Sequence, residues 1–488
     1  MTDQLRRTRI LATLGPATDA PGVLDDLIRA GVNVVRMNFS HGTPDQHAAR
    51  VAAVRATAAA QGREVGILVD LQGPKIRIEK FAEGKVALRS GDRFSLDCRA
   101  DAPPGDRNRV GVSYLGLVGD VAPGDVLLLD DGLMAVKVVA VAGDQIHTEV
   151  LTDGFLSNRK GLNRLGGGLS LGALTDQDRE HIRIAAELGV DFIAVSFCRS
   201  AADIEEARAL ARAAGSDAWM VAKIERAEAI TNLVEITQAS EVVMVARGDL
   251  GVEIGDAELP GLQKKIIRTA VEHNRVVITA TQMLQSMVDN PIPTRAEVLD
   301  VANSVIDGTD AVMLSAETAS GSHPVKAVQA MVRICLGAER QFDHDTDFEK
   351  AERNLQRVDQ AIAMASMFLA EHINVRAIIA LTESGGTARY LSRFRSAAPI
   401  FGLSRHAAAR RRMALIRDVF PIHYDSQGKG TREAARGAVA HLFELGLLAE
   451  GDRVIITSGD HMEHHGATNT LRLLQVGPGG RAEGLGEL

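Results

Sequence analysis

A lysine and two carboxylates stand at the ends of two neighbouring expected strands. Lys223 and Glu225 belong to the end of the first strand, and Asp249 follows the second. Residues two apart in a strand project to the same side, so Lys223 and Glu225 share a face. Two carboxylates, with water and substrate in the remaining positions, are how Mg²⁺ is usually held. Together with an ammonium group, they indicate metal-assisted phosphoryl transfer, for which a protein supplies positioning and charge neutralisation.

Two arginines and a glycine complete this candidate site. Arg36 ends another expected strand and Arg77 follows a third, so both can converge with Lys223 on an anion. Gly248 directly precedes Asp249, and a glycine there lets a short helix begin with free N–H groups that bind a carboxylate or phosphate. The alternatives are a plain turn at Gly248 and buried ion pairs that only hold the fold together. The whole set, taken together, favours a functional site.

The elements that position these residues alternate between short β-branched strands and amphipathic helices, which is the pattern of parallel βαβ units. Strands are expected at residues 9–14, 32–37, 65–70, 191–197, 219–224, 241–246, 276–280 and 311–315. Helices are expected at 21–30, 44–61, 202–214, 227–238, 261–273, 294–307 and 324–338. Eight such strand–helix repeats form a closed α/β fold of the (β/α)8 TIM-barrel type. In that fold the reactive groups lie on the loops at the carboxyl ends of the strands.

Two further domains are expected. The long interval between the third and fourth strands contains short alternating strands, at 85–88, 93–96, 126–129, 135–140 and 145–150. We interpret residues 72–168 as an inserted small β-barrel domain that forms a lid over the barrel mouth. Residues 1–71 and 169–341 then form the barrel domain in two parts. Residues 342–488 are expected to form a C-terminal α/β domain with an open sheet.

Composition restricts the class of protein. The chain has 488 residues, of which 45% are hydrophobic and 24% are charged, as in a globular protein of several domains. A net charge of −8 argues against nucleic acid as a partner, because such binders need a basic excess. Three scattered cysteines without a CxxC pair support neither a disulfide framework nor a thiolate zinc site. No apolar run reaches the ~20 residues of a membrane span, so we expect a cytoplasmic protein without a membrane partner.

Six motifs then occur in the order in which they are found in pyruvate kinases. They are NVVRMNFSHG from residue 33, DLQGPKIR from 70, KIE from 223, ARGDLGVE from 246, ATQML from 280 and MLSAET from 313. On these motifs the chain resembles bacterial members of the pyruvate kinase family over essentially its whole length. The resemblance implies transfer of the phosphoryl group of phosphoenolpyruvate to ADP, giving pyruvate and ATP in the last step of glycolysis. It also implies a homotetramer.

The resemblance implies a role for each matching residue. Lys223 would stabilise the migrating phosphoryl group, Thr281 would help to deliver a proton to the enolate, and Arg36 is the third catalytic residue. The expected substrate-binding residues are Arg36, Lys223, Gly248, Asp249, Thr281, Ser196 and Ser315. The expected nucleotide-binding residues are Arg77, Lys160, His41 and Asn38. Glu225 and Asp249 would hold Mg²⁺, for which Mn²⁺ is expected to substitute.

The DLQGPKIR motif departs from a common form of the family at Lys75. In members that require K⁺ this position is a glutamate, and the resemblance places a monovalent cation near Asn38, Ser40 and Asp70. A lysine ammonium can supply a fixed positive charge at a comparable place. We therefore expect a K⁺-independent enzyme in which Lys75 replaces the cation. The alternative is a solvated surface lysine.

A hydroxyl- and glycine-rich turn in the C-terminal section is a candidate effector site. Its residues are Thr382, Ser384, Gly385, Gly386 and Thr387. Backbone N–H groups at a helix start can hold a phosphate together with such hydroxyls, and in the family this region hosts sugar-phosphate or nucleotide effectors. A plain N-cap turn explains the same residues equally well.

Two other functions compete with this interpretation. A related barrel enzyme, such as a lyase or mutase, would handle phosphoenolpyruvate or oxaloacetate enolates without a nucleotide, but a nucleotide lid that carries Lys160 has no purpose there. A catalytically dead regulatory binder would keep the scaffold. The presence of Lys223, Glu225, Asp249 and Thr281 argues against the binder.

Two further motifs are given no chemical role. Residues 461–465 have the sequence HMEHH, with metal-ligand residue types, and are interpreted as a solvated loop. The arginines at 410, 411 and 412 are interpreted as a solvated helix face or a subunit contact rather than a nucleic-acid patch.

Overall fold

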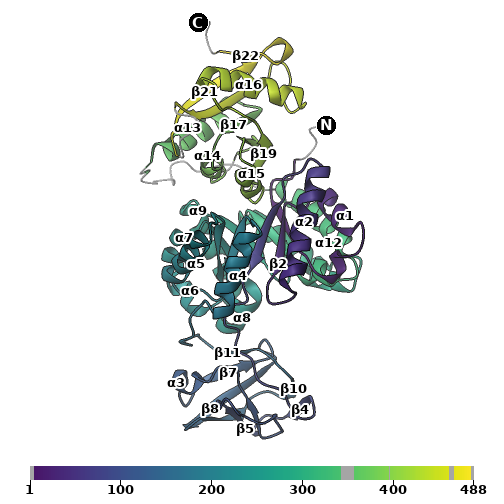
Figure 1. The fold of residues 1–488 in the computed structure, drawn as a ribbon, viewed down its shortest axis with the longest axis vertical. Coiled ribbons are helices and arrows are strands. Elements are labelled where there is room, and N and C mark those ends of the chain that lie inside the picture. The colour runs from purple at the N-terminus through teal and green to yellow at the C-terminus, as the bar shows by residue number, and fades with distance from the viewer. Residues whose placement is uncertain (1–4, 342–354, 356, 395, 461–465, 485–488) are drawn as a thin grey trace.

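The structure is a computed structural model that describes residues 5–341, 355, 357–394, 396–460 and 466–484. Figure 1 shows three bodies stacked along the long axis of the molecule. A strand–helix barrel lies in the middle, the inserted β domain at one end and the C-terminal α/β domain at the other. Among the described helices, none has the length and apolar composition needed to cross a membrane.

The central body is a closed barrel of parallel strands in the order β1-β16-β15-β14-β13-β12-β3-β2. Their bounds are β1 Arg9–Thr13, β2 Val34–Asn38, β3 Gly66–Asp70, β12 Phe192–Val195, β13 Trp219–Ile224, β14 Val242–Ala246, β15 Val276–Ala280 and β16 Ala311–Leu314. All of them coincide closely with the expected strands, because strands buried on both faces read as continuous apolar runs. The predicted TIM barrel is confirmed.

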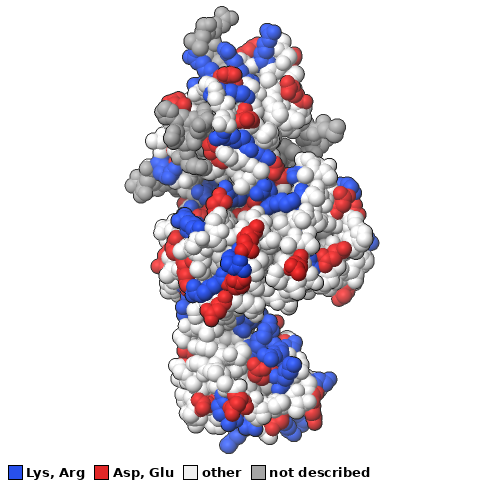
Figure 2. Space-filling view, viewed as in Figure 1, with Lys and Arg blue, Asp and Glu red and all other residues white. Residues whose placement is uncertain are grey.

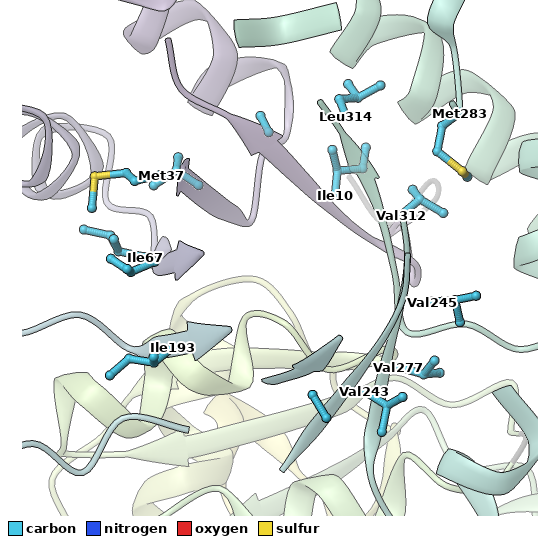
Figure 3. Close-up of a cluster of buried hydrophobic side chains, with 14 of the residues drawn as sticks. Ile10, Met37, Ile67, Ile193, Val243, Val245, Val277, Met283, Val312 and Leu314 are labelled. Atoms are coloured by element: carbon cyan, nitrogen blue, oxygen red, sulfur yellow. The ribbon is translucent and has the colours of Figure 1, made fainter. Parts of the chain in front are cut away.

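Helices cover the outside of the barrel. They are η1 Pro16–Thr18, α1 Val23–Ala30, α2 Pro44–Ala60, α4 Asp176–Glu187, α5 Ala201–Ala213, α6 Ala227–Thr231, α7 Leu233–Ala239, α8 Arg247–Ile254, α9 Leu259–Glu272, η2 Gln285–Val288, α10 Arg295–Ile306, α11 Ala316–Ala319 and α12 Pro324–Glu339. Strand side chains such as Ile10, Val277 and Val312 belong to the buried layer between strands and helices (Figure 3).

Helix α4 was not expected from the sequence, and α6 and α7 were expected as one helix. Helix α4 begins with a capping box, in which the Thr175 hydroxyl accepts the Asp178 N–H at 3.1 Å and the Asp178 carboxylate accepts the Thr175 N–H at 2.9 Å. This capping box was the available signal for α4. The expected helix at 227–238 is interrupted at Asn232 and forms α6 and α7.

The inserted domain is all-β, as expected. Its elements are β4 Lys85–Leu88, β5 Arg93–Asp97, β6 Arg109–Gly111, α3 Leu117–Asp120, β7 Val126–Leu129, β8 Met134–Ala142, β9 Gln145–Val150, β10 Gly154–Ser157 and β11 Leu162–Arg164. Six strands pair in the order β11-β7-β8-β9-β5-β6, and β10 pairs with β4. Arg77 bridges to Gly161 beside β11, and Ile78 bridges to Val112 beside β6. One segment therefore joins both edges of the sheet, which curls it into a small barrel with its own core.

The C-terminal domain contains the expected open sheet, in the order β19-β18-β17-β20-β21-β22. Its elements are α13 Val358–His372, β17 Ala377–Leu381, α14 Gly386–Leu391, β18 Ile400–Ser404, α15 Ala407–Met413, β19 Val419–His423, α16 Thr431–Glu444, β20 Arg453–Gly459, β21 Thr468–Val476, η3 Pro478–Gly480 and β22 Ala482–Glu483. Strands β17 to β20 run parallel, whereas β21 and β22 are antiparallel. The motif at 461–465 lies outside the described residues.

The arginine run of α15 joins the C-terminal domain to the barrel. Arg410 pairs with Glu64, Arg411 Nε lies 2.8 Å from Asp191, and Arg412 Nη1 lies 2.9 Å from Asp217. Arg410 and Arg412 are buried. The interpretation of this run as a solvated face or subunit contact is therefore wrong, because its charges are neutralised by acidic residues of the same chain.

Candidate active site

The candidate site residues lie at the carboxyl ends of the barrel strands, on the side where the inserted domain leaves the barrel after β3 (Figure 1). Arg36 and Asp70 belong to β2 and β3, and Lys223 belongs to β13. Gly248 and Asp249 lie in the first turn of α8, which begins directly after β14, as the sequence analysis expected. Thr281 and Ser315 follow β15 and β16.

Asp70 is the centre of a buried network of charges. Its Oδ2 lies 2.6 Å from Arg36 Nη2, and its Oδ1 lies 3.2 Å from Lys223 Nζ. Burial acts to raise the pKa of Asp70, but Lys223 and Arg36 outweigh it and lower the pKa overall. The sequence analysis assigned Asp70 only to a monovalent-cation site and missed this role. A buried aspartate at the end of an apolar strand was the signal for it.

The Lys223 ammonium is fixed by three partners. Besides Asp70, its Nζ lies 2.8 Å from Glu225 Oε1 and donates to Ser196 Oγ at 2.8 Å. Burial acts to lower the pKa of Lys223, but Asp70 and Glu225 outweigh it and raise the pKa overall. Lys223 therefore stays positively charged and holds one position at the mouth of the barrel.

Glu225 and Asp249 are close enough to repel one another. Burial raises the pKa of Glu225, and the charge of Asp249 raises it further, although Lys223 opposes both effects. The second oxygen of Glu225, Oε2, accepts the Phe197 N–H at 2.8 Å. Within the described ranges, no group of three or more His, Cys, Asp or Glu side chains is arranged to hold a metal ion. A metal at this carboxylate pair would therefore complete its shell with substrate and water.

Lys75 pairs with Asp249 and Asp131 rather than with Asn38, Ser40 or Asp70, the residues of the expected monovalent-cation site. Its Nζ donates to Asp249 Oδ1 at 3.1 Å and lies 3.8 Å from Asp131 of the inserted domain. Asn38 Oδ1 instead accepts the backbone N–H of Ser40 at 3.0 Å.

Thr281 is held in an unusual backbone conformation. Its φ is 67° and that of Gln282 is 54°, a region that few residues other than glycine adopt. The Thr281 hydroxyl accepts the Gly248 N–H at 2.8 Å and donates to the Ala280 carbonyl at 2.6 Å. Arg247, which the sequence analysis did not single out, supports this turn by donating to the Thr281 carbonyl at 2.7 Å.

The expected nucleotide residues are not drawn into the Asp70 network. Arg77 donates to the Arg159 carbonyl at 2.9 Å, and Lys160 pairs with Asp130 at 2.8 Å, so both bond within the inserted domain. His41 is exposed on the loop after β2. Among the residues that the structure describes, the buried Ser315 hydroxyl at the end of β16 has no hydrogen-bond partner.

The turn at 382–387 borders a cavity of about 310 Å³ in the C-terminal domain. Gly385 N donates to Thr382 Oγ1 at 3.0 Å, and the hydroxyls of Thr387 and Thr468 are 2.7 Å apart. Arg357 and Arg389 also line the cavity. Arg389 belongs to α14, the helix that begins at this turn, whereas Arg357 precedes α13 and is paired with Asp359 at 2.7 Å. Asp359 and Glu383 line the cavity as well.

A closed (β/α)8 barrel with a charged, lysine-centred site at its mouth, an inserted β domain and a further α/β domain is the architecture of an enzyme class that handles anionic substrates. The family model for the pyruvate kinase barrel domain matches residues 5–328, and that for the pyruvate kinase alpha/beta domain matches residues 360–474. The chain belongs to the pyruvate kinase family. Its fold and its family are thus as the sequence predicted.

Individual relatives agree over the whole chain. Pyruvate kinase II of Salmonella typhimurium is 54% identical over 480 residues, which cover 98% of this chain and 100% of the relative. Pyruvate kinase of Haemophilus influenzae is 50% identical over 474 residues, covering 96% and 98%. A crystal structure of a pyruvate kinase from Cryptosporidium parvum is 32% identical and aligns with a TM-score of 0.91 over 96% of both chains. The chain is therefore a phosphotransferase whose substrates are phosphoenolpyruvate and ADP and whose reaction depends on a divalent metal.

Proposed function

We propose that the chain transfers the phosphoryl group of phosphoenolpyruvate to ADP with Lys223 as the cation that stabilises the migrating group. The observation that carries this proposal is the position of the Lys223 ammonium, which is fixed between Asp70 and Glu225. A buried, permanently charged group at a strand end needs no reorganisation when negative charge develops on the phosphoryl oxygens. Arg36, held by Asp70, supplies a second fixed cation.

We further propose that Glu225 and Asp249 hold the divalent metal as Mg²⁺, with Mn²⁺ able to replace it. The mutual repulsion that contributes to the raised pKa of Glu225 supports this, because a divalent cation would relieve it. When bound, Mg²⁺ would neutralise charge on the substrate oxygens. The Ser196 and Ser315 hydroxyls would bind substrate around this position, and the Gly248 N–H would do so on leaving the Thr281 hydroxyl, to which it donates in this structure.

Proton delivery is assigned to Thr281. Phosphoryl transfer breaks the bond between phosphorus and the enol oxygen, forms a bond to the terminal phosphate oxygen of ADP and leaves the enolate of pyruvate. That enolate must take a proton on carbon. The Thr281 hydroxyl is oriented by Gly248 and Ala280, which supports its use as the last donor of a water-linked path.

The inserted domain is proposed to be a nucleotide lid. Residues 72–168 would close over the mouth formed by residues 1–71 and 169–341, while 342–488 form the effector and oligomer domain. Arg77 and Lys160 would move from their present partners to the ADP phosphates, and Asn38 and His41 would meet the nucleotide from the barrel. Lid closure of this kind excludes water from the reacting group.

One assay tests the proposed reaction. The protein is given phosphoenolpyruvate, ADP and Mg²⁺, and both pyruvate and ATP are measured. Equal amounts of both products are expected. Pyruvate without ATP would favour a lyase instead, and no turnover would favour a catalytically dead binder.

We propose that the enzyme does not need K⁺. The Lys75 ammonium beside Asp249 supports this proposal, because it provides a fixed positive charge at the mouth of the barrel. Activity is measured in Tris buffer with and without KCl, and the two rates are expected to agree closely. Activation by K⁺ of about tenfold or more, a lowering of the barrier by about 1.4 kcal/mol, would contradict the proposal. A Lys75→Glu variant is expected to become K⁺-activated.

We also propose that the cavity beside residues 382–387 binds a phosphate-bearing effector and that the enzyme is a homotetramer. Arg357 and Arg389 on the cavity wall support a phosphate ligand. Sugar phosphates and nucleoside monophosphates are titrated while activity at low phosphoenolpyruvate is followed. Ser384→Glu is expected to abolish activation through charge repulsion, with Ser384→Ala as the uncharged control. Sedimentation velocity tests the tetramer.

A further inference from the structure

The return of the inserted domain to the barrel passes through three consecutive glycines. Residues Gly166, Gly167 and Gly168 have φ of 83°, 77° and 92°, a run of backbone that residues with side chains rarely adopt. We call residues 166–168 the hinge. They follow β11, which ends at Arg164. It is anchored to the barrel, because Gly166 N donates to the Glu253 carbonyl at 2.9 Å and Gly168 N donates to the Glu228 carboxylate.

The Glu253 side chain extends this anchor in two directions. It is 2% exposed. Its Oε2 accepts the Ala227 N–H at 3.0 Å, and its Oε1 is 3.4 Å from Asn163 Nδ2 in β11. Both partners are donors, so both carboxylate oxygens of Glu253 act as hydrogen-bond acceptors.

The positions of Glu253 and its partners in the chain show which segments this contact connects. Glu253 lies one helical turn after Asp249 in α8, on the same face of the helix. Ala227 is the first residue of α6 and lies two residues after Glu225. One carboxylate therefore joins the helix that carries Asp249, the backbone next to Glu225 and the last strand of the inserted domain.

We propose that Glu253 is a positioning residue that sets the separation of Glu225 and Asp249 and links that separation to the position of the lid. The inference rests on the proposed metal site at Glu225 and Asp249. A shift of α8 that accompanies metal binding moves Glu253, and Asn163 with it, so binding at the barrel mouth is transmitted to the glycine hinge. The same link makes lid position a determinant of metal affinity, because coupling between two sites is reciprocal.

The free-energy cost of burying the charged side chains of Glu253 and Arg226 supports a role for Glu253 beyond packing. Burial raises the pKa of Glu253 to about 7, and Glu228 adds to that, while the Ala227 amide, Arg226 and Asn163 oppose it. Arg226 is itself buried and donates to the Leu169 carbonyl at 3.0 Å, on the barrel side of the hinge. Two charged residues thus hold the hinge from the barrel at a place where apolar side chains would pack without a desolvation cost.

Two variants remove the two side-chain hydrogen bonds of Glu253 one at a time. Asn163→Ala removes the bond to the inserted domain. Ala227→Pro removes the N–H group that donates to Glu253 Oε2. Proline is accepted at the first position of a helix. The extended backbone of Arg226 (φ −119°, ψ 152°) also suits a following proline. Glu253→Ala removes both side-chain hydrogen bonds. Glu228→Gln is the matched control, because it weakens a hinge anchor that does not belong to α8.

Binding of Mn²⁺ to the full chain is measured from the EPR signal of free Mn²⁺, and hydrogen exchange is followed in peptides covering 162–170. Ala227→Pro is expected to weaken Mn²⁺ binding roughly fivefold, as for one lost hydrogen bond. Asn163→Ala is expected to change the binding less than Ala227→Pro, because it removes only the coupling to the lid. In the parent protein Mn²⁺ should slow exchange at the hinge, and this effect should vanish in Asn163→Ala and Glu253→Ala but persist in Glu228→Gln.

Unchanged Mn²⁺ affinity in Ala227→Pro, or an undiminished Mn²⁺ effect on the hinge in Asn163→Ala, would overturn the inference. The Glu225→Gln variant distinguishes a failure of the inference about Glu253 from a failure of the proposed metal site. Glu225→Gln should lose Mn²⁺ binding whether or not Glu253 acts as proposed. If Glu225→Gln bound Mn²⁺ like the parent protein, the proposed metal site would be wrong.

Discussion

The ammonium of Lys223 lies 3.2 Å from Asp70 and 2.8 Å from Glu225, and these carboxylates raise its pKa against the opposing effect of burial. We therefore expect Lys223 to stay protonated near neutral pH, and a pH dependence of kcat in that range to arise from other groups.

Removal of this charge should affect the transition state more than the bound substrates. Lys223→Ala is expected to lower kcat by about 10³-fold or more, while KM for phosphoenolpyruvate and ADP changes little. Steady-state kinetics check this, with Lys137→Ala, an exposed lysine of β8, as the control. A decrease in kcat of less than about tenfold would remove Lys223 from the role proposed for it.

Glu253 gives a stability prediction with a definite sign. Burial raises its pKa to about 7 in the folded chain, from an ordinary value of 4.5. Between these pH values the folded chain keeps a proton that the unfolded chain has released, so the free energy of unfolding falls by about 1.4 kcal/mol per pH unit. Glu253→Gln cannot titrate. The stability of this variant relative to the parent is therefore expected to rise by about 2 kcal/mol between pH 5.5 and 7.5.

Urea unfolding at the two pH values measures this difference. Glu258→Gln is the control, because Glu258 is exposed at the start of α9 and lies outside the hinge contacts. A difference between Glu253→Gln and the parent that does not change with pH would show that Glu253 is ionised throughout.

At the scale of elements, the sequence predicted what depends on local pattern. The barrel strands are apolar runs between helices, so their order and bounds could be read directly. Helix α4 was missed because its first turns are polar and only Ile182 and Ala185 are buried apolar positions. The pairing of Lys75 with Asp249, 174 residues away, and that of Asn163 with Glu253, 90 residues away, depend on how the inserted domain sits on the barrel. No local pattern carries that information.

The turn that leads from β3 into the inserted domain also constrains the site. Gly73 has φ of 65°, and a Cβ there would lie 2.8 Å from Ser196 Cβ and from the Phe197 ring. Both neighbours support the network, because the Ser196 hydroxyl accepts from Lys223 and the Phe197 N–H donates to Glu225.

Gly73→Ala is therefore expected to displace both contacts and to lower kcat by about 10²-fold, the usual effect of a small misplacement of catalytic groups. Gly84→Ala is the matched control. Gly84 also has a positive φ, 79°, but a Cβ there would meet nothing within 4 Å. Both variants should lose about 1 kcal/mol of stability from backbone strain, and only Gly73→Ala should lose activity. Equal kcat values in the two variants would contradict the steric argument.

At the scale of the whole molecule, the C-terminal domain and the barrel share a continuous interior. One buried cluster contains Leu11, Val34 and Leu68 of the barrel strands together with Met367 and Leu391 of the C-terminal domain. Basic side chains are visible along the boundary between the two bodies in Figure 2. The C-terminal domain thus rests on the end of the barrel opposite the candidate active site, and a signal from the proposed effector cavity would have to cross this boundary.

The most buried ion pair of that boundary joins Arg393 to Asp310. Their side chains are 2% and 1% exposed, and Arg393 Nη1 lies 2.9 Å from Asp310 Oδ2. Asp310 also accepts the backbone N–H groups of Arg417 and Val277, at 3.0 and 2.9 Å, so it joins the C-terminal domain to the start of two barrel strands. Loss of the arginine would leave this buried carboxylate without its main counter-charge.

Arg393→Ala is therefore expected to destabilise the protein by about 3–5 kcal/mol, the usual cost of removing one partner of a buried pair. Because the pair joins two bodies, we also expect the variant to unfold in two calorimetric transitions, with the C-terminal domain first. Arg183→Ala is the control, because Arg183 pairs with Glu180 and Glu187 on the solvent face of α4 and should leave the thermogram unchanged. A single transition at the parent temperature in Arg393→Ala would mean that the shared apolar interior alone couples the barrel to the C-terminal domain.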